Sequence, residues 1–424
     1  MKKKYFFLIK RSNDLDHCLP IIYALLKKGV SKSKIFVTDI EYNHSNFNLS
    51  QNKLYKYLLS QNIKTNFLIS KICSFFFEKI IFGENLYFNE NLKKNNLFKN
   101  YTILLFKQFI QILFVIKIIF YSINKNKIYF IFKYNNFAIK VLNKLNSNKN
   151  SILNLPHGFP LWDGPDEFLS EAHNSKIFLN HPLVNTIFFE GKQNYEWFYF
   201  LKFNYKTKFN KKLFYDQFKI FPLRYTQDWI KILQHKILKL NKNYISKKKE
   251  GNFKNILFFP SKLHSHIENK IFDENLQKEA IFYILEKYKD VTLNIRFHPS
   301  QFKNLKLYQE FKDFKNCKFH LGEKISTLEL VLENDIILGV YTSALLDAIA
   351  LNKKIIILKH CSNVIPSINI NNTENHQDFK NIFDKLMNNT PNKEEYFNTY
   401  NNLIHPQEYR DGDIFEMYLK QLSL

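Results

Sequence analysis

The stretch RFHPS at residues 296–300 combines three residue types that suit the binding of a phosphate group. Arg296 carries a permanent positive charge, and His298 can donate a hydrogen bond to a phosphate oxygen or a proton to a departing one. Pro299 ends the strand that the alternating residues VTLNI predict. We therefore predict a phosphate site here, with a purely structural histidine as the alternative. Arginine is scarce in the chain and is found at Arg11, Arg224, Arg296 and Arg410.

Two other predicted strand ends carry groups that can bind the same phosphate. In GVYTSALLDAIALN a strand ends at Val340, and a helix is expected to begin near Thr342 or Ser343. Either hydroxyl can cap that helix, and free N–H groups at a helix start attract anions. In FFPSK, Ser261 and Lys262 follow another strand. These four residues join the predicted phosphate site, and an ordinary helix cap is the alternative at Thr342 and Ser343.

The first half of the chain offers candidate acid–base groups in LNLPHGFPLWDGPDEF. His157 and Asp163 each precede a glycine in this loop, which follows a predicted strand. An imidazole or carboxylate near a bound substrate can act as a general base. We therefore take His157 and Asp163, together with His298, as candidate catalytic residues. The alternative is a loop in which Gly, Pro and Asp serve only the turn geometry.

Several common catalytic motifs are missing from the sequence. It contains no GxGxxG, no GxxxxGK[ST] and no GxSxG, and it has only nine glycines. Dinucleotide-dependent dehydrogenases, P-loop NTPases and serine hydrolases are therefore disfavoured. His264 and His266 lack a surrounding set of cysteines or carboxylates, and the four cysteines lie far apart. We predict no metal, no cofactor and a reducing, cytoplasmic location.

Predicted strands and helices alternate along both halves of the chain. Alternation of this kind indicates an α/β fold with two Rossmann-like, doubly wound domains, which we expect to face a cleft. Ligands of such sheets bind beyond the carboxyl ends of the strands. The predicted strands are 5–9, 34–40, 127–133, 151–155, 185–190, 255–259, 291–297, 317–321, 335–340 and 353–360, and the clearest predicted helices are 18–29, 279–288, 326–332 and 341–352.

The formal charge of +24 comes almost entirely from lysine, in a chain that is also rich in asparagine, isoleucine and phenylalanine. That composition is typical of an AT-rich genome, and nucleic-acid readers favour arginine, so we predict no nucleic-acid partner. A basic surface suits an anionic membrane or a phosphorylated substrate. The apolar segment 101–123 is long enough to span a bilayer, but two lysines and two glutamines interrupt it. We favour a core helix or a helix on the membrane face.

The segments PHG, RFHPS and GVYTSALLDAIALN together resemble bacterial surface-polysaccharide glycosyltransferases of the GT-B type. They are most similar to enzymes with CMP- or CDP-activated donors, namely sialyl- and polysialyltransferases, Kdo transferases and CDP-glycerol glycerophosphotransferase-like proteins. The resemblance covers the C-terminal part best. It implies that His298 and Pro299 contact the donor phosphate, and that Thr342 and Ser343 bind the same phosphate.

The resemblance gives two different clues to the catalytic base. Sialyltransferases carry an acidic-acidic-glycine motif, which Trp162-Asp163-Gly164 matches only in its second and third positions. Kdo transferases and CDP-glycerol enzymes instead carry a histidine-glycine pair after a strand, which His157-Gly158 matches. The first clue assigns the base to Asp163, and the second points to His157 and a different donor.

The implied function is transfer of a sugar from a nucleotide-activated donor, CMP-linked in the first instance, to the hydroxyl of a glycan or glycolipid acceptor without a metal. The implied location is the cytoplasmic face of the bacterial inner membrane, with peripheral contact. Three alternatives remain: a CDP-glycerol-type polyol-phosphate transferase, a UDP-sugar 2-epimerase of similar fold, and a non-enzymatic protein of capsule export. Each of them fits part of the motif pattern.

We expect two domains joined by a lysine-rich linker. The predicted limits are an N-terminal, acceptor-side domain at 1–229, the linker at 230–252, and a nucleotide-sugar-binding domain at 253–395. A helical tail at 396–424 is expected to pack back toward the N-terminal domain, as the resemblance to GT-B enzymes implies.

Overall fold

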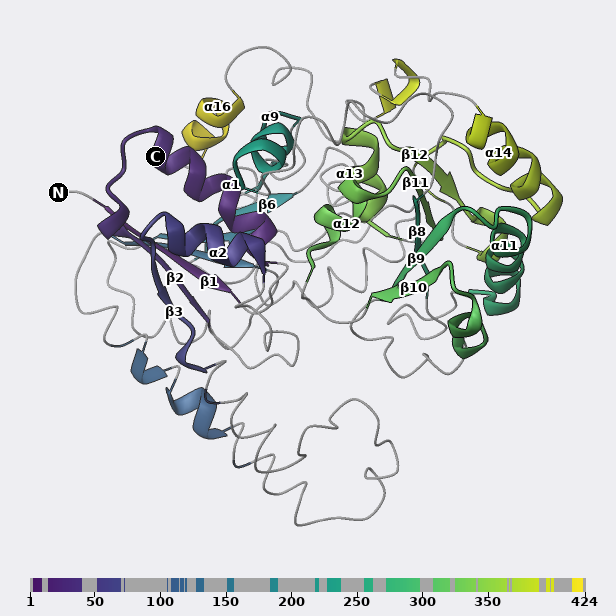
Figure 1. Cartoon of the computed structure of the whole chain (residues 1–424). Coiled ribbons are helices and arrows are strands. Elements are labelled where there is room, and N and C mark those ends of the chain that lie inside the picture. Colours follow the sequence, from purple (N-terminus) through teal and green to yellow (C-terminus); the bar gives the residue numbers. More distant parts are fainter. Residues whose placement is uncertain are drawn as a thin grey trace, which may run out of the picture. The chain divides into compact units, whose positions relative to one another are not determined.

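The chain forms two compact units, each built around its own parallel sheet (Figure 1). The first sheet has seven strands in the order β3-β2-β1-β4-β5-β6-β7, and the second has five in the order β10-β9-β8-β11-β12. Two parallel α/β sheets confirm the predicted fold class. The computed structural model describes residues 3–9, 14–39, 52–69, 72, 105, 108–113, 115–117, 119, 127–132, 151–155, 184–189, 218–220, 227–237, 255–261, 272–297, 308–320, 325–340, 342–363, 366, 368–388, 394–396, 398–399 and 414–421.

The first unit is organised by a strand that is buried on both faces. Phe7, Leu8 and Ile9 of β1 are 0% exposed, which explains the continuous apolar run YFFLI. Helix α1 starts with Asp14 and Asp16, whose charges suit a helix N-terminus. The elements of this unit are β1 (Lys4–Ile9), α1 (Asp14–Lys27), a 3₁₀ turn (Lys32–Lys34), β2 (Ile35–Asp39), α2 (Lys53–Ser60), β3 (Lys64–Asn66), β4 (Lys127–Phe132), β5 (Ser151–Leu155), β6 (Val184–Phe189) and β7 (Phe218–Ile220).

The second unit repeats the strand–helix alternation around β8. Every strand pairing in its sheet is parallel. Its elements are α9 (Gln227–Ile232), a π-helical turn (Leu233–Ile237), β8 (Asn255–Phe259), α11 (Glu274–Lys287), β9 (Thr292–Arg296), β10 (Cys317–His320), α12 (Thr327–Glu333), β11 (Ile336–Gly339), α13 (Ala344–Ala350), β12 (Lys354–Ile357), a 3₁₀ turn (Lys359–Cys361), α14 (His376–Asn388) and α16 (Ile414–Gln421).

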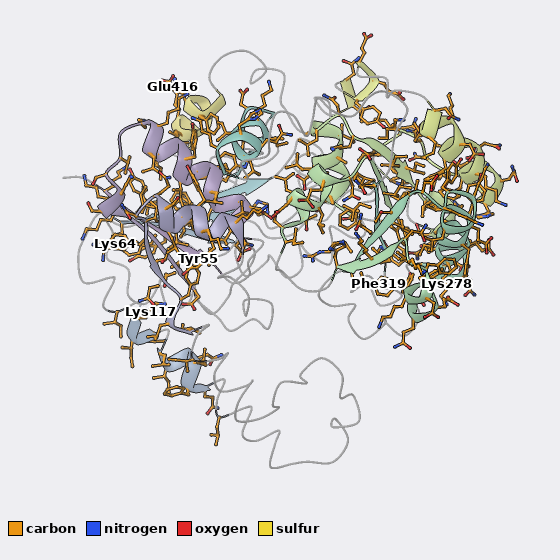
Figure 2. The ribbon with its side chains drawn as sticks, viewed as in Figure 1. Tyr55, Lys64, Lys117, Lys278, Phe319 and Glu416 are labelled. Atoms are coloured by element: carbon orange, nitrogen blue, oxygen red, sulfur yellow. The ribbon has the colours of Figure 1, made fainter. Side chains whose placement is uncertain are left out.

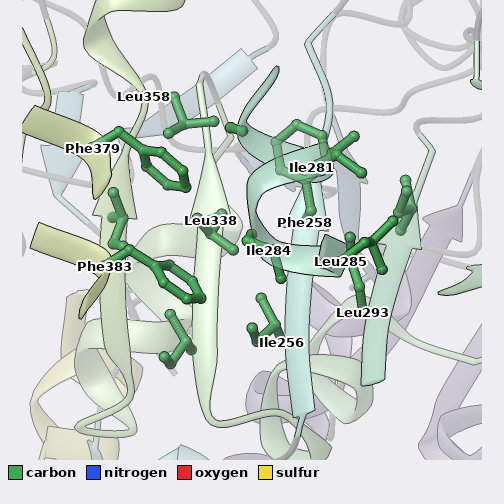
Figure 3. Close-up of a cluster of buried hydrophobic side chains, with 14 of the residues drawn as sticks. Ile256, Phe258, Ile281, Ile284, Leu285, Leu293, Leu338, Leu358, Phe379 and Phe383 are labelled. Atoms are coloured by element: carbon green, nitrogen blue, oxygen red, sulfur yellow. The ribbon is translucent and has the colours of Figure 1, made fainter. Parts of the chain in front are cut away.

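The alternating side chains of the central strands build a separate core on each face of the second sheet. Ile256 and Phe258 of β8 pack with residues of α11 and α14, as Figure 3 shows. Leu257 and Phe259 point to the opposite face and pack with residues of α12 and α13. Apolar residues at consecutive positions of β8 therefore reflect helices on both faces, as a doubly wound sheet requires.

Helix α11 begins at Glu274, five residues before the predicted start, because the Asp273 side chain accepts hydrogen bonds from the N–H groups of Asn275 and Leu276 at 2.8 and 3.0 Å. Residues 227–237 are helical and include the start of the predicted linker. The domain limits and the packing of the C-terminal tail stay predictions.

The described residues between 105 and 119 are helical, in line with the helix expected from the apolar segment 101–123. Within the described parts of the chain, no helix is long and apolar enough to cross a membrane.

Candidate functional site

The carboxyl edge of the five-stranded sheet gathers the described candidate residues on neighbouring strands. Phe259 of β8 pairs with Gly339 of β11, and Arg296 of β9 pairs with His320 of β10. The strand order reverses between β8 and β11, since β8 connects to β9 on one side while β11 lies on the other. Open α/β sheets bind their ligands at such a reversal. Ser261, Arg296 and Thr342 therefore belong to one sheet edge at the expected position.

Arg296 is the last residue of β9, and it is 8% exposed. A guanidinium that is nearly buried at a strand end supplies a fixed positive charge at the carboxyl edge of the sheet. His320 ends the adjacent strand β10 at the same level. Burial lowers the pKa of His320, and the positive charge of Arg296 lowers it further. The pair thus combines one permanent cation with one neutral imidazole.

A chain of three side-chain amide and imidazole contacts fixes the proton on His320. Asn334 Nδ2 donates to the Leu330 carbonyl at 2.7 Å, so its Oδ1 is the acceptor for Asn294 Nδ2 at 2.8 Å. Asn294 Oδ1 is then left facing His320 Nε2 at 2.8 Å. An amide oxygen can only accept, so Nε2 carries the proton and Nδ1 keeps its lone pair. Nδ1 has no partner among the described residues, which leaves it able to accept from a ligand.

The loop after β8 is held by a glutamine that the sequence analysis did not single out. Gln277 of α11 is 0% exposed. Its Oε1 accepts from the Ser261 N–H at 3.0 Å, and its Nε2 donates to the carbonyls of Asp273 and Ser261 at 3.1 and 3.4 Å. The clamp fixes the backbone at Ser261, whose side chain was predicted to contact phosphate.

A glycine lets the turn after β11 close tightly. A Cβ on Gly339 would lie 2.8 Å from the Thr342 Cγ2 atom, closer than two carbon atoms can approach. The hydroxyl of Thr342 accepts from the Ala344 N–H at 3.3 Å, whereas the Ser343 side chain makes no capping hydrogen bond. Of the two predicted caps, Thr342 caps α13 and Ser343 does not.

A second histidine at the same edge is fully engaged inside the protein. The Thr373 hydroxyl donates to the Ile357 carbonyl at 3.1 Å, so His360 Nδ1 must donate to that hydroxyl at 2.6 Å. His360 Nε2 then accepts from the buried Cys361 thiol at 3.5 Å. Burial lowers the pKa of His360 and raises the pKa of the Cys361 thiol. Both ring nitrogens of His360 therefore have partners within the protein, in contrast to those of His320.

Four of the predicted phosphate-site residues lie in the part of the chain that the structure describes, and the other predicted site residues do not. Ser261, Arg296 and Thr342 lie at one sheet edge, and Ser343 begins α13 beside them. No group of three or more His, Cys, Asp or Glu that could hold a metal is found in the described residues. Outside the described residues lie Lys262, His298, Pro299, His157 and Asp163.

Sequence reasoning missed Gln277, Asn294, His320 and Asn334. Asn294 carried a signal, since it is a polar residue on the face of β9 that also presents Arg296. His320 carried one as well, because it ends a strand just as RFHPS does. Gln277 and Asn334 carried no such signal in the sequence. Gln277 bonds to backbone groups, and Asn334 bonds to a backbone carbonyl and to the amide of Asn294.

No protein-family model and no curated protein matches the chain, but solved structures do. A Methanocaldococcus jannaschii UDP-GlcNAc 2-epimerase in complex with UDP-GlcNAc and UDP aligns at 15% identity and a TM-score of 0.57, covering 100% of this chain and 99% of that one. A Neisseria meningitidis UDP-GlcNAc 2-epimerase bound to UDP-GlcNAc aligns at 13% identity and 0.56, covering 99% of each chain. A UDP-forming trehalose-phosphate synthase from Burkholderia xenovorans aligns at 8% identity and 0.50, covering 100% and 99%.

These likenesses define the fold class. The chain has the GT-B-like fold, with two parallel Rossmann-like sheets, that these epimerases and the synthase share. At such low identity the likeness concerns the fold and assigns no activity.

Replacing Gln277 with Leu should destabilise the protein by about 1–3 kcal/mol, because it leaves the N–H and carbonyl of Ser261 buried without their partner. Urea unfolding measures the change. Gln377→Leu, on the exposed side of α14, is the matched control and should change little. Equal midpoints for the two variants would show that the clamp contributes nothing.

Gly339→Ala should cost about 1–3 kcal/mol, because the new methyl group collides with Thr342 Cγ2. The double variant Gly339→Ala/Thr342→Ser removes that methyl while keeping the hydroxyl, and it should recover most of the loss. Thermal unfolding compares the three proteins. A double variant no more stable than Gly339→Ala would contradict the collision.

Asn294→Asp should raise the pKa of His320, because a carboxylate that accepts from Nε2 stabilises the imidazolium. In the wild type, His320 should titrate below the usual histidine value of about 6.5. Deuterium exchange at the imidazole C2–H, read by mass spectrometry, follows each histidine separately. His360 is the internal control and should not move. An unchanged His320 in the variant would refute the proton assignment.

Proposed function

We propose that the protein binds a nucleotide-activated sugar at the carboxyl edge of the five-stranded sheet and acts on that sugar. The observation that carries the proposal is the position of Arg296, a nearly buried cation at the carboxyl end of β9, the neighbour of β8, beyond which the strand order reverses. A diphosphate needs fixed positive charge and hydrogen-bond donors at such an edge. Support comes from solved structures of the same fold that were determined with UDP-GlcNAc or with UDP-GlcNAc and UDP bound.

The first candidate reaction is inversion at C2 of a UDP-N-acetylhexosamine. The epimerases among the similar structures favour it over the CMP-sugar transfer that the motifs suggested. In such a reaction one proton leaves C2 while the bond from C1 to the diphosphate oxygen breaks, so the electron pair forms a C1=C2 double bond. The diphosphate then adds back at C1 as a proton returns to C2 on the opposite face, and the composition of the sugar nucleotide is unchanged. His157, Asp163 and His298 are the acid–base candidates, and the neutral His320 is available to accept a hydrogen bond from the ligand.

The second candidate is transfer of the sugar to a glycan or glycolipid hydroxyl, favoured by the RFHPS and GVYTS motifs and by the likeness to a synthase of the GT-B-like fold. The acceptor oxygen bonds to the anomeric carbon while the bond to the phosphate oxygen breaks. The acceptor proton passes to Asp163 or His157. Arg296, His298 and Lys262, with hydrogen bonds from Ser261, Thr342 and Ser343, stabilise the charge on the leaving nucleotide. If the reaction is transfer, we propose a CMP- or CDP-linked donor and a location at the inner face of the membrane.

A thermal-shift panel with CMP, CDP, UDP, GDP and ADP tests the binding proposal. A ligand at a hundredfold excess over its Kd stabilises by about 2.7 kcal/mol, so the preferred nucleotide should raise Tm by several degrees. We expect UDP to be preferred and Arg296→Gln to lose at least tenfold in affinity. Arg296→Gln tests the described cation, and His298→Ala the predicted phosphate contact. His235→Ala, at an exposed position, is the control.

Other outcomes of the panel point elsewhere. A CMP preference would restore sialic-acid-like or Kdo donors, and a CDP preference would indicate polyol-phosphate transfer. No response to any nucleotide would overturn the proposal in favour of a non-enzymatic role in export. Incubation of UDP-GlcNAc in D₂O then separates the two reactions. Deuterium at C2 without an acceptor identifies the epimerase, and UDP release that requires an acceptor identifies the transferase.

A further inference from the structure

The helical residues between 105 and 119 are fixed to the first sheet through one side of the helix. Lys117 Nζ donates to Asp39 Oδ1 at 2.7 Å and to the Asn66 carbonyl at 2.9 Å. The two charged side chains are 9% and 0% exposed. Ile110 lies on the same side, seven residues earlier, and is 4% exposed. Figure 2 labels Lys117 on this helix. The ion pair therefore sets which face of the helix turns outward.

The outward face is a stripe of large apolar side chains. The five members named below, from Leu105 to Ile119, are separated by four, three, four and three residues. This spacing places them along one side of an α-helix. Their exposed fractions are 49% for Leu105, 48% for Phe109, 57% for Ile112, 44% for Ile116 and 41% for Ile119. Leu68, two residues after the Asn66 carbonyl that Lys117 binds, is also 50% exposed. We call these six residues the apolar stripe. Such a patch marks a contact surface.

Among the described residues of the first unit, every exposed charged side chain is a lysine. Its three described carboxylates, Asp14, Asp16 and Asp39, are 1%, 8% and 0% exposed. Seven described lysines of this unit are exposed by contrast, before β1, on α1, α2 and the edge strand β3, and in the connections between them. The exposed lysines of this unit are Lys3, Lys27, Lys28, Lys32, Lys53, Lys56 and Lys64. An apolar stripe on a unit with exposed lysines is complementary to the surface of a bilayer, where anionic headgroups cover an apolar layer.

We propose that the apolar stripe docks on the surface of a bilayer that contains anionic phospholipids, with the helix lying in the plane of the interface. The stripe extends over about 21 Å at 1.5 Å per residue, a length suited to an interfacial helix. A second copy of the chain fits less well, because two lysine-rich surfaces without exposed described carboxylates repel each other. The buried Lys117–Asp39 pair keeps the stripe outward without using any of the exposed charges. The proposal holds for either reaction considered above.

Co-sedimentation of the full-length protein with vesicles tests the proposal. Vesicles of phosphatidylcholine with about one third phosphatidylglycerol should bind the protein, and pure phosphatidylcholine vesicles should bind it much less. Binding to the anionic vesicles should weaken as salt rises. The triple variant Phe109→Ser/Ile112→Ser/Ile116→Ser should lose at least tenfold in binding, since it removes the side chains that enter the interface.

Matched controls separate docking from misfolding. Leu59→Ser removes an exposed apolar residue at the end of α2, 45% exposed, and should bind vesicles like the wild type. The triple variant should keep the thermal midpoint and nucleotide response of the wild type, because its changes lie on the surface. Failure of the wild type to bind anionic vesicles, or equal binding by the triple variant, would overturn the proposal. A wild-type dimer that the triple variant turns into a monomer, without vesicle binding, would assign the stripe to self-association instead.

Discussion

Parallel pairing of β8 with β9 on one side and β11 on the other is the constraint on which the candidate site depends. The pairing places the ends of three strands at one level. Ser261, Arg296 and Thr342 therefore share one edge of the sheet although they are far apart in sequence. It is stabilised from both faces, because alternate residues of β8 enter different cores. A slip of one residue in β8 would turn its side chains to the opposite faces and so mismatch both cores.

Much of this arrangement was predictable because parallel strands buried on both faces leave long apolar runs. Strands are predicted by the apolar runs NILFF, DIIL and KIII. The reversal in strand order follows from right-handed crossovers. The start of α11 was less accessible, because a capping Asp273 is indistinguishable from any other surface aspartate until its partners are known. The clamp formed by Gln277 was beyond the sequence altogether, since it depends on how closely α11 approaches the β8 loop.

The electrostatics of the edge were predictable only in part. Arg296 stood out because arginine is scarce. The protonation of His320, by contrast, depends on a chain of two side-chain amides and one helix carbonyl, from β9, from the residue after α12 and from α12 itself. The site combines a fixed cation with an uncharged acceptor, which differs from a simple cluster of positive charge. The proposed nucleotide-sugar ligand offers a partner for each, because it carries an anionic phosphate and hydroxyl donors close together.

Two of the described cysteines are buried thiols whose reactivity depends on local unfolding. Cys18 in α1 and Cys361 beside His360 are both 0% exposed, and burial raises the pKa of each thiol. Only a thiolate in contact with solvent reacts quickly with an alkylating reagent. Each of these cysteines therefore reacts only when the unit around it opens, and one lies in each unit. The rates at which the two sulfurs are capped would report separately how often each half of the protein opens.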